Sequence, residues 1–254
     1  LKQLWDRGLL YQDLKGTPLC PRCVTSLSSH EVALGYREDT PDPSVFVKFR
    51  VVASPPGPLS AKIPPNPPLQ RGDGGILNSD IPTYLLVWTT TPWTLPGNTA
   101  LAVDPEAEYS LIEIEGEVGP ERLILASALL DQVIKEPYQV VSTFKGSQIA
   151  HGGLTYDNLQ EGASPTVLLY ESLYDPAEFG VEIRRSGYKD GATTLEPAKA
   201  LQTHVVPADF VSMAEGTGIV HIAPAFGDED LSLGREKRLA FVQPVDLQGV
   251  VTGT

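Results

Sequence analysis

Residues 53–80 carry proline and glycine so densely that neither a helix nor a strand can persist there. A loop of this length is unusual inside a compact domain. We therefore expect a disordered surface excursion between two paired strands. The alternative is a proline-rich ligand for another protein module. In both cases the fold has to be built from the residues on either side.

Short runs of apolar and β-branched residues flank this stretch. Val45, Val47 and Phe49 occupy alternate positions, as in a half-buried strand. Similar patterns predict strands at 31–36, 44–52, 84–91, 99–103, 109–114, 205–210 and 218–222. We expect helices at 1–8, 121–135 and 228–239, the last acidic at its start and basic at its end. Many short strands and few helices predict a mostly β (α+β) fold, a distorted antiparallel β-barrel with peripheral helices.

The charge balance is acidic, with 19 Lys and Arg against 32 Asp and Glu and a net charge of -13. Such a surface repels phosphate backbones, which argues against broad electrostatic binding of nucleic acid. A nucleic acid that presents only a single-stranded end to one pocket remains compatible with this charge.

No apolar run approaches the roughly 20 residues of a membrane helix, so we expect a cytoplasmic protein. The start at Leu1 and the single methionine, Met213, suggest a piece of a longer polypeptide.

Consecutive hydroxyls mark the first candidate site segment, residues 88–98. In an extended strand, Thr89 and Thr91 point to one face and Thr90 to the other, and Pro92 ends the strand. Hydroxyls beside the Trp88 indole can bind a ribose or an ester and offer a stacking surface. The alternative is purely structural, since threonine favours strands and tryptophan favours cores.

The second candidate segment is residues 216–230. Gly216 and Gly218, on either side of Thr217, allow close approach of a ligand to the backbone. His221 follows an apolar strand, and Asp230 falls in the first turn of the expected helix, where a carboxylate can bind an ammonium group. The structural alternatives are a satisfied core histidine and a carboxylate that complements the helix dipole.

The two cysteines form a Cys20-Pro-Arg-Cys23 pair, half of a tetrahedral zinc site. His30 is a possible third ligand. Because the chain has no other cysteine, we expect a metal-free half-site or a site shared with another chain.

Together these segments resemble the editing domain of isoleucyl-tRNA synthetase, a class I aminoacyl-tRNA synthetase. The valine and leucine enzymes typically have arginine at the position of Thr91, which here precedes Pro92-Trp93-Thr94. His221 in Gly-Thr-Gly-Ile-Val-His-Ile-Ala-Pro points to the isoleucine enzyme too, and the cysteine pair with residues 28–36 resembles the part just before its editing insert. The resemblance runs, with gaps, from residue 1 to about 250 and is weak across 53–80 and 150–200.

The resemblance implies three parts: a connecting segment with half a zinc ribbon (1–43), an editing domain of the class I synthetase type (44–240) and a return connector (241–254). Editing needs no cofactor; zinc is possible in the intact parent enzyme, and the ATP-dependent ligation site lies outside this piece. The implied partners are the 3′ end of charged tRNA(Ile) and the remaining domains of the parent, with no membrane.

The implied activity is hydrolysis of misacylated Val-tRNA(Ile). It is needed because a synthetic site rejects an amino acid that is one methylene smaller only weakly, isoleucine against valine being the standard example of this limit. Asp230 would bind the α-ammonium group, and the wall near His221 would exclude isoleucine. His221 is also the one obvious candidate for a catalytic general base, and we expect a ribose hydroxyl of the tRNA to help position the water instead. Thr89, Thr90 and Thr91 would hold the terminal ribose, the ester and the water, with Thr94 a weaker candidate. Trp93 would pack against the terminal adenosine. The pocket would be lined by Gly216, Thr217 and Gly218.

Two alternatives stay open. The chain could be a non-catalytic insert that binds the tRNA end, or an unrelated β-barrel hydrolase that matches by chance. The second alternative predicts that the two segments lie far apart in space.

Overall fold

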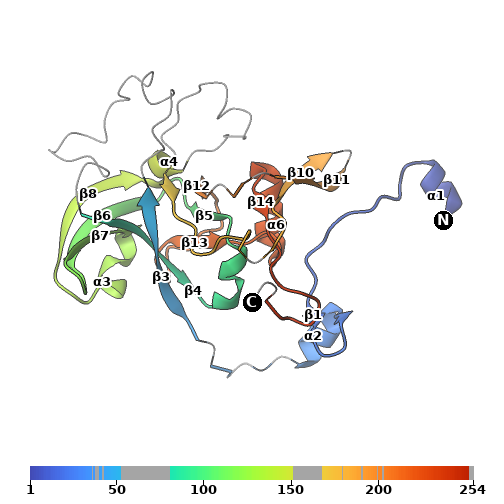
Figure 1. The fold of residues 1–254 in the computed structure, drawn as a ribbon, viewed down its shortest axis with the longest axis horizontal. Coiled ribbons are helices and arrows are strands. Elements are labelled where there is room, and N and C mark those ends of the chain that lie inside the picture. The colour runs from blue at the N-terminus through green and yellow to red at the C-terminus, as the bar shows by residue number, and fades with distance from the viewer. Residues whose placement is uncertain are drawn as a thin grey trace, which may run out of the picture.

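The computed structural model describes residues 1–35, 37, 40–41, 43–52, 81–150, 168–178, 180–189, 191–198, 200–201 and 203–251. The expected excursion at 53–80 lies outside these residues. Strands dominate the fold, and the helices are short and peripheral (Figure 1). None of the described helices is long and apolar enough to cross a membrane.

The main sheet has nine strands. In spatial order they are β13 (Ile219–Ile222), β5 (Ala100–Val103), β12 (His204–Pro207), β9 (Leu169–Tyr170), β3 (Val45–Val52), β4 (Thr83–Thr89), β7 (Pro120–Ala126), β6 (Glu108–Glu115) and β8 (Tyr138–Lys145). The β12–β5 and β4–β7 pairs are parallel and the others antiparallel. The prediction of a mostly β fold is confirmed.

The predicted antiparallel barrel needs correction. Over the described residues the strand order is open, because β13 and β8 each have only one strand neighbour. The sheet is mixed because β4 and β7, and also β5 and β12, are joined by long connections that contain other elements. Such crossovers allow parallel pairing, which a tight hairpin does not.

Two further predictions are wrong. The helix expected over 121–135 is replaced at 121–126 by strand β7 (Pro120–Ala126), and only η2 (Ser127–Leu129) and α3 (Leu130–Val133) within that range are helical. Ile124 packs into one apolar cluster and its neighbours Leu123 and Leu125 into another, so β7 is covered on both faces. A continuous apolar run of this kind does not distinguish a strand from a helix.

Residues 31–36, expected to form a strand, lie largely in helix α2 (Ser29–Gly35). The Ser28 hydroxyl accepts a hydrogen bond from the Glu31 backbone N–H at 3.3 Å, and the Glu31 carboxylate accepts one from the Ser28 backbone N–H at 2.8 Å. This reciprocal capping box starts a helix. It overrides the apolar pattern that follows.

The remaining elements are not part of the main sheet. They are α1 (Lys2–Asp6), the β1 (Leu19–Cys20) and β2 (Thr25–Ser26) hairpin, η1 (Pro92–Gly97), α4 (Gly146–Ile149), α6 (Asp228–Lys237), and a small sheet of β10 (Arg184–Lys189), β11 (Ala192–Pro197) and β14 (Ala240–Phe241). The start of α6 at Asp228 agrees with the helix predicted at 228–239.

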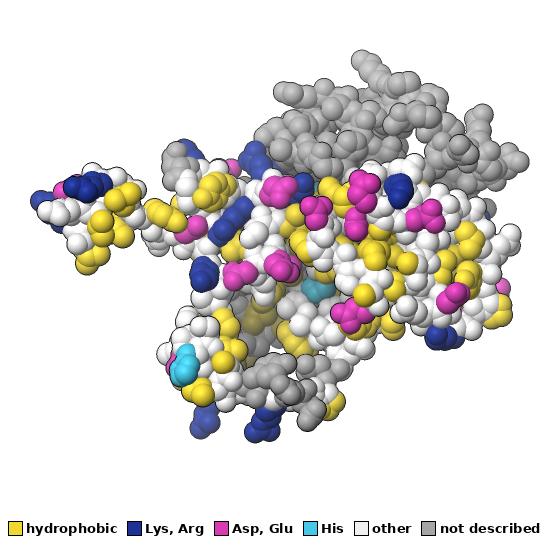
Figure 2. All heavy atoms as spheres, turned by 180° about the vertical axis from the view of Figure 1, so that it is seen from behind, with side chains coloured by type: hydrophobic (Ala, Val, Ile, Leu, Met, Phe, Trp, Pro, Cys, Tyr) yellow, Lys and Arg dark blue, Asp and Glu magenta, His cyan; other side chains and the backbone are white. Residues whose placement is uncertain are grey.

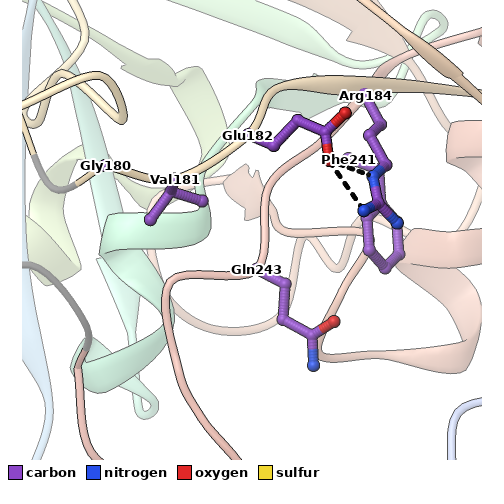
Figure 3. A pocket seen from close by; sticks show the side chains of 6 residues that line it. All are labelled: Gly180, Val181, Glu182, Arg184, Phe241 and Gln243. Carbon is purple, nitrogen blue, oxygen red and sulfur yellow. Dashed lines mark hydrogen bonds and ion pairs between the residues drawn. The ribbon is translucent and has the colours of Figure 1, made fainter.

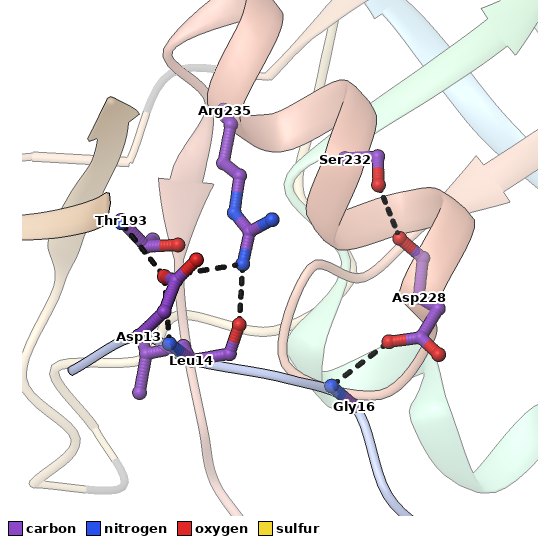
Figure 4. Close-up of polar contacts among 7 residues, drawn as sticks. All are labelled: Asp13, Leu14, Gly16, Thr193, Asp228, Ser232 and Arg235. Atoms are coloured by element: carbon purple, nitrogen blue, oxygen red, sulfur yellow. Dashed lines mark hydrogen bonds and ion pairs between the residues drawn. The ribbon is translucent and has the colours of Figure 1, made fainter. Parts of the chain in front are cut away.

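Residues 13–16, which we call the strap, fasten the N-terminal segment to α6 and β11 (Figure 4). The Gly16 N–H donates to Asp228 Oδ1 at 2.8 Å, and the Thr193 N–H donates to Asp13 Oδ1 at 2.7 Å. Arg235 lies 3.6 Å from the same Asp13 oxygen. The strap therefore contacts both the first turn of α6 and a residue two turns further along.

Candidate functional site

The first site segment forms a tight turn at the end of β4. Thr89 is buried, whereas Thr90 and Thr91 are exposed before η1 begins at Pro92. The Thr91 N–H donates to Thr89 Oγ1 at 3.1 Å, and the two hydroxyl oxygens lie 3.3 Å apart. The expectation that Thr89 and Thr91 share one side is confirmed. We call residues 89–94 the threonine turn.

A hydrogen bond joins this turn to the second segment. Thr94 lies in η1, and its Oγ1 is 3.0 Å from His221 Nε2 on β13, a residue 127 positions away. Strand β13 also contacts β4 without being its hydrogen-bonded neighbour in the sheet. The two segments therefore meet in space, as the editing-site interpretation required.

The hydrogen bonds around Thr94 assign the proton on the His221 ring. Thr94 Oγ1 donates to the Thr91 carbonyl oxygen at 2.8 Å, and a carbonyl can only accept. The hydroxyl proton is thus used, so His221 Nε2 donates to Thr94. Burial lowers the pKa of His221 to about 4, so the ring is neutral at pH 7. Its Nδ1 is then an acceptor, buried and without a partner among the described residues.

Asp230 lies next to the same strand end. Its Oδ2 accepts a hydrogen bond of 2.8 Å from the backbone N–H of Ala223, two residues after His221. The side chain is half-buried, and burial raises the pKa of its carboxyl group. The carboxylate and the imidazole are therefore attached to one short stretch of backbone.

The glycine loop at 216–218 closes against β4 and β7. Gly216 and Gly218 have φ angles of +74° and +71°, which favour glycine. A Cβ on Gly216 would lie 2.8 Å from the Trp88 ring, so only glycine allows this approach. The Thr217 carbonyl accepts from the Ala126 N–H at 2.9 Å. Thr217 and Gly218 are buried and Gly216 is half-buried, so a ligand can reach the backbone of this loop only at Gly216, and the Thr217 hydroxyl is not available.

Trp93 projects from η1 and is 58% exposed, so its indole is available to a partner. Within the described part of the chain, its indole N–H has no hydrogen-bond partner. Its predicted contact with an adenosine therefore rests on its position within η1.

The cysteine pair sits on the β1–β2 hairpin as two free thiols. The neighbouring Cys23 lowers the pKa of Cys20 by hydrogen bonding, which favours the thiolate that a metal needs. Over the described part of the chain, no group of three or more His, Cys, Asp or Glu residues could hold a metal ion. His30 is therefore not brought to the cysteines as a third ligand.

Two of the cavities that the described residues form lie outside this cluster of hydrogen bonds. One of about 260 Å³ is lined by Gly180, Val181, Glu182, Arg184, Phe241 and Gln243, with an ion pair of 2.7 Å between Glu182 and Arg184 (Figure 3). The other, of about 750 Å³, is bordered by the exposed residues Asp228 and Glu229 but not by Asp230. The candidate site is thus defined by its hydrogen bonds and not by these hollows.

Figure 2 shows acidic side chains spread across one face, as the net charge predicts.

Sequence reasoning missed two tyrosines that hold these segments in place. The buried Tyr109 hydroxyl donates to the Gly218 carbonyl at 2.6 Å, and the buried Tyr170 hydroxyl donates to Asn98 Oδ1 at 2.7 Å. A tyrosine within an otherwise apolar strand was the available signal, since a buried phenol needs a hydrogen-bond partner. The identity of that partner depends on contacts that are distant in sequence.

Comparison with known protein families by family-wide patterns finds no match. Individual proteins do match. The chain is 42% identical over 255 residues to isoleucine–tRNA ligase of Dehalococcoides mccartyi strain CBDB1, covering 100% of this chain and 22% of that protein. It is 41% identical over 249 residues to the same enzyme of Thermus thermophilus, covering 98% of this chain and 18% of that protein.

Among solved structures, the chain aligns with GlLeuRS-CP1 at a TM-score of 0.44 and 17% identity, over 75% of this chain and 57% of that one. It aligns with the Plasmodium falciparum cytosolic leucyl-tRNA synthetase editing domain at a TM-score of 0.38 and 15% identity, over 60% and 45%. At these scores the alignments add nothing to the sequence matches.

The chain is a segment related to the aminoacyl-tRNA synthetases. More narrowly, it belongs to the isoleucine–tRNA ligase family, and it spans about a fifth of the length of the relatives it matches. The alternative of an unrelated β-barrel hydrolase is therefore wrong.

Proposed function

We propose that the chain hydrolyses the ester bond of misacylated tRNA, with Val-tRNA(Ile) as its substrate. The observation that carries this proposal is the meeting of the two segments: Thr94 bonds His221, and Ala223 bonds Asp230. Hydroxyls, a neutral imidazole and a carboxylate are thereby collected around one strand end. The three-part division of the chain, the cytoplasmic location, and the tRNA(Ile) 3′ end and parent domains as partners belong to the same proposal.

Asp230 is the proposed binding residue for the α-ammonium group. Burial disfavours its charged form, and a bound ammonium supplies the missing counter-charge. The Ala223 N–H already occupies Oδ2 and fixes the orientation of the carboxylate. We assign Oδ1 to the substrate, through a charge-assisted hydrogen bond.

The threonine turn is the proposed site for the ester and the water. An aminoacyl ester is already reactive, so positioning a water and stabilising the developing oxyanion is sufficient. The exposed Thr90 and Thr91 hydroxyls suit the polar groups of a ribose, while the buried Thr89 hydroxyl, 3.3 Å from that of Thr91, holds the turn in place. Trp93 would contact the adenosine, and the 216–218 loop would line the pocket through the Gly216 backbone. No cofactor takes part in this chemistry.

His221 serves as a wall in this proposal and not as the general base. A pKa of about 4 makes the imidazole a weak base at neutral pH, far from the range in which proton transfer is efficient. A ribose hydroxyl of the tRNA is then the group that helps to position the water. The rigid, neutral ring limits the size of the bound side chain.

The test is a deacylation assay on Val-tRNA(Ile) and Ile-tRNA(Ile) side by side. Asp230→Asn keeps an acceptor for Ala223 but removes the charge, and we expect kcat/KM on Val-tRNA(Ile) to fall roughly 100-fold. Glu236→Gln, exposed in the last turn of the same helix, is the matched control and should stay within about twofold because it lacks a ligand role. Wild-type activity of Asp230→Asn would exclude the ammonium role.

His221→Ala tests the size limit. Removing the ring should let the site begin to hydrolyse Ile-tRNA(Ile), because space then becomes available for the larger side chain. Full protection of Ile-tRNA(Ile) in this variant would exclude the wall. If wild-type protein binds the tRNA end but leaves Val-tRNA(Ile) intact, the chain is a non-catalytic binding insert.

A further inference from the structure

Tyr170 is a fully packed aromatic residue with one polar atom. Its side chain is 2% exposed and meets the Phe49 ring edge-on, with the ring centroids 5.2 Å apart. A phenylalanine would fill this space equally well. The hydroxyl adds a cost of burial unless it is bonded, and it donates to Asn98 Oδ1 at 2.7 Å.

Asn98 is the C-cap residue that directly follows η1. Its backbone N–H donates to the Leu95 carbonyl at 2.9 Å, and its side-chain Nδ2 donates to the Ala100 carbonyl at 2.9 Å. The side chain is 4% exposed, so its remaining acceptor also has to be satisfied internally. Tyr170 provides that bond and so determines how η1 joins β5.

The threonine turn is thereby held at both ends. At its start the Thr89 hydroxyl accepts from the Thr91 N–H at 3.1 Å, and just beyond its end the Asn98 amide is held by Tyr170. Thr94 lies between these two points. Its 3.0 Å hydrogen bond to His221 tolerates a shift of η1 of only about 0.5 Å, because a bond of this type is lost beyond about 3.5 Å.

We propose that Tyr170 is a positioning residue: its hydroxyl, acting through Asn98, sets the distance between Thr94 and His221. This inference rests on the proposed function for its effect on catalysis, but its geometric part concerns the free protein. Tyr170 touches no reacting group. In the main sheet Tyr170 of β9 pairs with Val51 of β3, and both side chains belong to the main apolar cluster.

The first experiment uses the free protein. Nitrogen-15 NMR of the imidazole reports which ring nitrogen of His221 carries the proton, and His221→Gln identifies its signals among those of the four histidines. In wild type we expect protonated Nε2 and unprotonated Nδ1. In Tyr170→Phe we expect the Nε2 signal to shift and its proton to exchange faster with water, because Thr94 no longer holds it.

The second experiment is deacylation of Val-tRNA(Ile) by the same variants. Tyr170→Phe should lower kcat about 10- to 100-fold, as expected for a misplacement near 1 Å. KM should change less than about twofold, since Asp230 and its ammonium site are untouched. In a Thr94→Val background, which lacks the positioned hydroxyl, the same substitution should cost less than about twofold, because coupled residues are not additive.

Tyr138→Phe is the matched control. It also removes a phenol that donates to a side chain, here Asp131 at 3.0 Å, but on the exposed edge strand β8. It should leave both the His221 signals and kcat as in wild type. If Tyr170→Phe does not fold, Asn98→Ser tests the same bond from its other partner.

Unchanged His221 signals in Tyr170→Phe would overturn the proposal. An equal fractional loss of kcat with and without the Thr94 hydroxyl would also overturn it, because that pattern indicates general destabilisation. If wild type fails to deacylate while the His221 signals respond to Tyr170→Phe, the proposed function fails and the positioning role stands.

Discussion

The neutral, buried His221 predicts a specific dependence of stability on pH. Its pKa falls from 6.5 in the unfolded chain to about 4 in the folded protein because of burial. The folded state therefore binds the proton more weakly than the unfolded state. The contribution of the neutral His221 ring to the free energy of unfolding is fully present above pH 6.5. It is lost as the pH falls through 6.5 toward 4.

The size of the effect follows from the same shift. Each pKa unit corresponds to about 1.4 kcal/mol, so the full contribution is about 3 kcal/mol. Between pH 7.5 and pH 5.0 we expect the free energy of unfolding to lose about 2 kcal/mol through His221 alone. Asp230 acts in the opposite direction, because burial raises its pKa and the folded state then binds its proton more tightly.

The measurement is urea unfolding of wild type and His221→Gln at both pH values. Every other titrating group is shared by the two proteins, so the difference between them isolates the histidine. We expect the stability of wild type relative to His221→Gln to be about 2 kcal/mol lower at pH 5.0 than at pH 7.5. A difference that stays constant within about 0.5 kcal/mol would refute a buried neutral imidazole.

Other consequences concern packing and metal binding. Gly218→Ala would place a Cβ in overlap with the Ala126 Cβ at a φ of +71°, and we expect urea unfolding to show a loss of about 3 kcal/mol. Leu85→Ala empties a fully buried core position and should cost about 2–5 kcal/mol in the same assay. Zinc added to the chain should be removed readily by a competing chelator, since Cys20 and Cys23 supply half of a tetrahedral site; retention against the chelator would contradict this.

Local patterns predicted those parts of the fold that depend on neighbouring residues. The alternation around Phe49 gave strand β3, and the acidic start near Asp228 gave α6. The prediction of a helix over 121–135 failed because β7 is covered by apolar clusters on both faces, a property that only the assembled sheet determines. In α2 the Ser28 and Glu31 side chains were the relevant signal, and the apolar residues after them were given too much weight.

The candidate site shows the same division. The threonine repeat predicted correctly that Thr89 and Thr91 lie on one side. The bond between Thr94 and His221 joins positions 127 residues apart, and no spacing rule reaches that far. The proton on the His221 ring depends in turn on the Thr91 carbonyl, a backbone group with no signature in a sequence.

The strap of residues 13–16 has a consequence for local opening of the protein. The Gly16 and Thr193 amide protons are held by carboxylates on elements that are remote in sequence, so each exchanges with solvent only when the strap lifts. We expect the two amides to exchange together in hydrogen-exchange measurements, as one cooperative unit that includes the first turn of α6. Asp230 lies in that turn. If this turn opens only after the strap lifts, the rate of strap lifting is an upper limit on the rate at which the turn that carries the proposed ammonium site opens.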